Sequence, residues 1–87
     1  MQNPQPTILV VEDSPSARQL LDKVFEDNGC RLLHAIGVND SKRFIDAERV
    51  DLAVVDYWLP DGEGSEVIKY VEAQRPGAQA LIVTTAG

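Results

Sequence analysis

The sequence has 87 residues, of which 44% are apolar and 25% charged, and its formal net charge at pH 7 is -6. This composition is typical of one soluble globular domain and excludes a disordered or fibrous chain. The acidic balance argues against a nucleic-acid surface, and no apolar run is long enough to span a membrane. Cys30 is the only cysteine, which excludes an internal disulfide and favours a cytoplasmic protein.

The chain opens with a short polar segment and then a strand. Residues 1–6 lack a basic stretch followed by a long apolar one, so we expect a flexible leader rather than a targeting signal, with the domain occupying residues 7–87. The run TILVV, residues 7–11, is rich in β-branched residues and shows no polar alternation. It predicts a strand buried on both faces.

A helix is predicted between residues 13 and 29. Asp13 or Ser14 offers the cap, Pro15 occupies the first turn and Gly29 closes the helix. Apolar residues recur there at spacings of three and four, namely Ala17, Leu20, Leu21, Val24 and Phe25. This spacing indicates one apolar face.

The remaining chain continues to alternate strands and helices. We predict a strand at 31–35, a helix at 39–49, a strand at 51–56, a helix at 64–74 and a strand at 80–85. Asn39 or Asp40 starts the first of these helices, which turns Phe44 and Ile45 inward. Such alternation predicts an α/β fold with a doubly wound parallel sheet, and ligands beyond the carboxyl ends of the strands.

Polar side chains follow three of the predicted strands. They are Glu12, Asp13, Asp56, Thr84 and Thr85. If these strands are neighbours, the carboxylates converge, and their repulsion raises their proton affinity unless a cation is bound. Carboxylate oxygens suit Mg²⁺, whereas a single histidine, His34, and one cysteine cannot make a zinc site.

Three segments in this order, ILVVEDSPSARQLL, LAVVDYWLPDGEG and LIVTTAG, resemble the receiver domain of two-component response regulators. The resemblance covers residues 7–87 and implies the flavodoxin-like receiver fold. It also implies that Asp56 accepts a phosphoryl group from a histidine kinase or a phosphotransfer protein. Asp13 would bind Mg²⁺ directly and Glu12 largely through its waters, and Trp58 would add its backbone carbonyl.

The same resemblance gives Thr85 a hydrogen bond to the phosphoryl group and a switching movement. Simpler interpretations stay open: Asp13 caps the helix, Glu12 is solvated, and the ring of Trp58 packs on a neighbour. A haloacid-dehalogenase-like phosphatase would need an acid where Trp58 stands, and a P-loop protein would need G-x-x-x-x-G-K-[ST], which is absent.

The chain departs from the family pattern after Gly87. The resemblance implies that a fourth helix, a fifth strand with its lysine and aromatic switch residue, and a fifth helix are missing. We therefore expect an incomplete receiver whose uncovered surface favours a homodimer. It would not be an enzyme beyond weakened self-phosphorylation and self-dephosphorylation. The alternative is an interaction or dimerisation module that no longer signals by phosphate.

Overall fold

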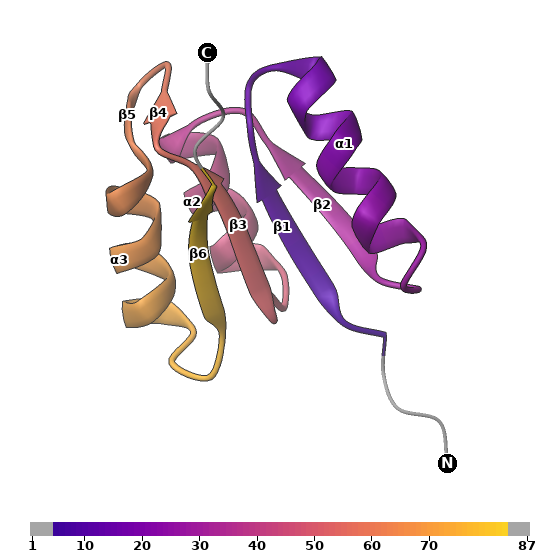
Figure 1. The fold of residues 1–87 in the computed structure, drawn as a ribbon. Coiled ribbons are helices and arrows are strands. Elements are labelled where there is room, and N and C mark those ends of the chain that lie inside the picture. Colours follow the sequence, from indigo (N-terminus) through magenta and orange to yellow (C-terminus); the bar gives the residue numbers. More distant parts are fainter. Residues whose placement is uncertain (1–4, 84–87) are drawn as a thin grey trace.

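A computed structural model of the protein describes residues 5–83, and Figure 1 shows a parallel sheet with helices on both sides. In chain order the elements are β1 (Thr7–Val11), α1 (Pro15–Glu26), β2 (Arg31–Ala35), α2 (Val38–Ala47), β3 (Leu52–Asp56), β4 (Trp58–Leu59), β5 (Gly62–Glu63), α3 (Gly64–Gln74) and β6 (Gln79–Val83). The main sheet has the order β2-β1-β3-β6, with all neighbours parallel. The predicted doubly wound α/β fold is confirmed.

The two faces of the sheet contact different helices because alternate side chains of each strand point to opposite faces. On one face, Leu9 and Val55 pack with residues of α2 and α3, among them Ile45 and Val67, which are fully buried. On the other face, Val10 and its neighbours Ile8 and Val54 pack against half-buried residues of α1. Every residue of β1 is buried, as the run without polar alternation predicts.

Only part of the apolar face of α1 packs against the sheet. Leu21 and Phe25 pack against the sheet, but Leu20 and Val24 are 73% and 57% exposed. The helical spacing places all five apolar positions on one face, but these two lie at its exposed margin. The sheet contacts α1 from one side, so it covers only a narrow stripe of the helix among the residues described.

Some boundaries differ from those predicted. The predicted start of α2 at Asn39 or Asp40 was wrong, because the helix begins at Val38 with Gly37 as its N-cap. Between Asp56 and α3 the chain forms a two-stranded antiparallel hairpin, β4–β5, with Pro60 and Asp61 at its tip. No helix among residues 5–83 is long and apolar enough to cross a membrane.

Candidate functional site

Three acids meet at the carboxyl end of the sheet. Val11 and Val55 are paired in the register of β1 and β3, so the residues that follow them in each strand are neighbours. Glu12 and Asp13 come directly after β1, and Asp56 is the last residue of β3. Each acid can place one carboxylate oxygen within 4.8 Å of the other two. The predicted convergence of the three carboxylates is therefore observed.

Glu12 is the buried member of this group, with 2% of its surface exposed. Its backbone N–H donates to the carbonyl of Ala35 at 3.0 Å, and its Oε1 accepts from the N–H of Ser14 at 2.9 Å. Burial raises the pKa of the Glu12 carboxyl, and the charges of Asp56 and Asp13 raise it further against the opposing Ser14 hydrogen bond. A cation at this position would favour its charged form.

Asp13 is exposed and Asp56 is half-buried. The N-cap of α1 is Ser14, and no side-chain capping bond is formed there within residues 5–83, which argues against a capping role for Asp13. The three acids supply oxygen ligands only, with one buried carboxylate and two that solvent can reach. This donor set fits Mg²⁺, which takes one or two protein carboxylates and retains several waters.

The other predicted site residues lie in different surroundings. Trp58 is 69% exposed, and its ring stands edge-on to that of Tyr57 with centroids 4.7 Å apart. Thr84 and Thr85 lie outside the described residues. His34 contacts Asp22 through Nε2 at 2.7 Å and does not belong to the acid group. Half-buried Cys30 packs against the apolar face that α1 covers.

Two sets of acidic contacts beside the site were not predicted from sequence. Asp61, at the tip of the β4–β5 hairpin, accepts hydrogen bonds from the backbone N–H groups of Val38 and Asn39. Glu63 and Glu66 form a reciprocal capping box at the start of α3. The capping box had a sequence signal in the acids three residues apart, whereas the Asp61 contacts join segments more than 20 residues apart.

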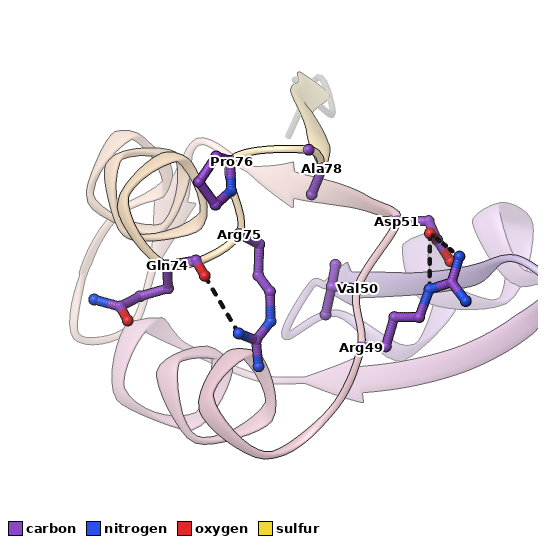
Figure 2. Close-up of a pocket in the computed structure, with 8 residues that line it drawn as sticks. Arg49, Val50, Asp51, Gln74, Arg75, Pro76 and Ala78 are labelled. Atoms are coloured by element: carbon purple, nitrogen blue, oxygen red, sulfur yellow. Dashed lines mark hydrogen bonds and ion pairs between the residues drawn. The ribbon is translucent and has the colours of Figure 1, made fainter.

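Two hollows of the surface among residues 5–83 lie away from the acid group. One, of about 410 Å³, is lined by α2 residues including Arg43 and Phe44. Another, of about 340 Å³, lies at the amino end of the sheet, where Figure 2 shows Arg49 and Asp51 paired and Arg75 beside Gln74. Each places cationic groups beside anionic or apolar ones. The carboxyl end differs from both hollows because it groups three carboxylates that form no ion pair with a cation of residues 5–83.

Residues 8–87 match the family model of the response regulator receiver domain. The chain belongs to this family. The match covers nearly the whole sequence, and it agrees with a parallel sheet that brings three acids together at its carboxyl end. This receiver is thus a domain of two-component signalling.

Curated relatives are longer than this receiver. It is 28% identical over 79 residues to the response regulator protein PilR of Pseudomonas aeruginosa, covering 91% of this chain and 18% of the relative. It is 29% identical over 80 residues to sporulation initiation phosphotransferase F of Bacillus subtilis, covering 92% of this chain and 64% of the relative. The receiver therefore spans less than two thirds of both proteins.

Solved structures share its fold. A CheY-like receiver from Methanospirillum hungatei superposes with a TM-score of 0.88 at 27% identity, over 97% of this chain and 67% of that one. The response regulator TrrA of Thermotoga maritima, solved in complex with Mg(2+)-BeF, gives a TM-score of 0.85 at 25% identity, over 92% of this chain and 70% of that one. These likenesses confirm the flavodoxin-like receiver fold.

Proposed function

We propose that this receiver accepts a phosphoryl group on Asp56 from the phosphohistidine of a histidine kinase or phosphotransfer protein. Glu12 and Asp13 would hold Mg²⁺ together with Asp56, and the backbone carbonyl of Trp58 would complete the protein's ligands. The observation that carries this proposal is the grouping of three carboxylates within 4.8 Å. The complex of TrrA with Mg(2+)-BeF supports it from a protein of the same fold.

The transfer needs one nucleophile and a site that tolerates its charge. A carboxylate oxygen of Asp56 attacks phosphorus, an O–P bond forms, and the P–N bond to the donor histidine breaks with its electron pair passing to the imidazole nitrogen. The half-buried position of Asp56 leaves it open to an incoming donor. Mg²⁺ held by the three acids would supply positive charge for the phosphoryl oxygens. The role of Thr85 as a hydrogen-bond donor to this group stays a prediction.

The test uses acetyl phosphate as the donor and intact-mass spectrometry as the readout. With Mg²⁺, the wild-type chain should gain the mass of one phosphoryl group, because a carboxylate in this setting can attack a small phosphodonor. The gain should be lost in Asp56→Asn, which removes the nucleophile but keeps the size of the side chain. An equal adduct on Asp56→Asn would contradict the proposal.

A second function is favoured by one observation. Leu20 and Val24 on α1 and Leu81 on β6 are exposed apolar residues, with exposed fractions of 73%, 57% and 45%. Exposed apolar side chains such as these suit a receiver-like module that associates with another protein or with a second copy. If the chain binds Mg²⁺, forms no adduct and is dimeric by light scattering, this module becomes the better description.

A further inference from the structure

The helix α2 begins without a capping side chain of its own. Its N-cap is Gly37, which has no side chain, and no local side-chain capping bond is formed. The cap comes from Asp61, whose Oδ1 accepts from the N–H of Val38 at 2.7 Å and whose Oδ2 accepts from the N–H of Asn39 at 3.0 Å. A carboxylate here also complements the positive end of the helix dipole.

The tip of the β4–β5 hairpin fits closely against this helix end. A Cβ added at Gly37 would lie 2.5 Å from Oδ1 of Asp61, so a larger residue there would displace the carboxylate from this position. Gly62 has a φ of 158°, and a Cβ there would lie 3.1 Å from Cγ2 of Val38. The turn therefore contacts the start of the helix at Asp61 and lies close to it at Gly62.

The other end of the same hairpin is attached to the end of β3, which carries Asp56. The N–H of Gly64 donates to the carbonyl of Tyr57 at 2.7 Å. A Cβ added at Gly64 would lie 2.3 Å from the backbone oxygen of Asp56, so these two backbones are in close contact. The segment that carries Trp58 is thus fixed to Asp56 at one end and to α2 at the other.

We propose that Asp61 is a positioning residue for the metal site, acting through the β4–β5 hairpin that it anchors to α2. This inference rests on the Mg²⁺ binding in the proposed function and adds a residue outside the acid group. Without the two hydrogen bonds of Asp61, the hairpin is no longer attached to α2, and the backbone of Trp58 is less fixed in position. The hydrogen bonds from Asn39 and Val38 also lower the pKa of the Asp61 carboxyl, because they favour the charged form that accepts them.

The experiment measures the Mg²⁺ dissociation constant of the full chain by calorimetry and by the fluorescence of Trp58, the only tryptophan. Asp61→Ala should weaken binding about tenfold, the usual effect of removing a partner that orients a metal ligand. Asp61→Asn carries the same charge as Asp61→Ala but keeps one acceptor oxygen, so its loss should be smaller. It also serves as the test if the alanine variant does not fold.

The matched control is Asp40→Ala. Asp40 belongs to the first turn of the same helix, where its Oδ2 accepts from the N–H of Ile36 at 3.0 Å and its Oδ1 lies 3.6 Å from Arg43. Its removal costs one acidic charge and one hydrogen bond at that helix end without touching the hairpin. The dissociation constant for Mg²⁺ should therefore change by less than about twofold, since water and salt screen the effect of one charge that lies outside the acid group.

Each outcome decides the inference. Weaker binding in Asp61→Ala than in both Asp61→Asn and Asp40→Ala supports a positioning role. Equal dissociation constants in wild type and Asp61→Ala, with only a lower melting temperature in the variant, would show that Asp61 is a helix cap alone. A wild-type chain without a saturable response to Mg²⁺ would overturn the metal part of the proposed function and this inference together.

Discussion

The two ends of the parallel sheet differ in whether their acidic residues form ion pairs. At the amino end, Asp51 accepts from the N–H of Thr7 at 2.8 Å and pairs with Arg49 at 3.0 Å, and Glu48 pairs with Arg31 at 2.7 Å. At the carboxyl end, Glu12 and its two acidic neighbours form no ion pair with any cation in residues 5–83. The acids at the amino end therefore have cationic partners, whereas those at the carboxyl end are grouped with one another.

The pKa values of Asp51 and Glu12 are shifted in opposite directions. The pKa of Asp51 is lowered, first by the Thr7 hydrogen bond and also by Arg49. The pKa of Glu12 is raised, first by burial and also by Asp56 and Asp13. Acids with partners stabilise the folded state in their charged form, whereas grouped acids lower its stability until a cation binds. We interpret the amino end as structural and the carboxyl end as functional.

The largest effect is expected at the amino end. Asp51→Ala leaves the buried N–H of Thr7 without its acceptor, so the free energy of unfolding should fall by about 2 kcal/mol. Urea unfolding measures this change. The control is Glu72→Ala, an exposed acid on α3, which should change stability by no more than about 0.5 kcal/mol. Equal losses in both variants would show that the Asp51 contacts add nothing specific.

The same variant gives a pH dependence with a definite sign. Because the folded pKa of Asp51 lies below its ordinary value of 3.8, its contribution is fully present above that pH. It is lost as the pH falls through the lowered folded pKa, since the carboxyl is then protonated in both states. The stability difference between wild type and Asp51→Ala should therefore narrow in acid. A gap that widens on acidification would contradict the assignment.

A smaller effect of opposite sign is expected at the carboxyl end. Glu12→Gln removes a buried charge while keeping an oxygen that can accept from Ser14, so without divalent ions the variant should be more stable by about 1 kcal/mol. Thermal or urea unfolding in a chelating buffer measures this. Mg²⁺ should then stabilise wild type more than the variant. A loss of stability in Glu12→Gln would make Glu12 a structural acid like Asp51.

Much of this molecule could be predicted from its sequence, because alternating apolar runs and helical periods define a parallel α/β sheet. The acid group followed from that topology, since Glu12 and Asp56 come at the carboxyl ends of strands that the structure shows to be adjacent. Leu20 and Val24 could not be distinguished from the buried face of α1, because periodicity shows which residues share a side but not how wide the covering surface is.

The contact between Asp61 and α2 was also beyond sequence reasoning. Aspartate is a common residue in turns, so the sequence indicates no other role for Asp61. Only the folded chain brings it to the start of α2. That contact also explains why the start of α2 was misplaced, since the local capping candidates Asn39 and Asp40 lie inside the helix. Local propensity cannot show a cap supplied from 22 or more residues away.

The most direct test of the contrast between the two ends is one Mg²⁺ titration followed by amide chemical shifts in ¹H–¹⁵N spectra. The account predicts saturable shifts with one dissociation constant for Glu12, Asp13 and Asp56, because these acids share one ion. The amide shifts of Thr7 and Asp51 should not change, because the Asp51 carboxylate already has the Thr7 N–H and Arg49 as partners. Equal, non-saturating shifts at both ends would contradict the account, because they would show only general attraction of cations to an acidic chain.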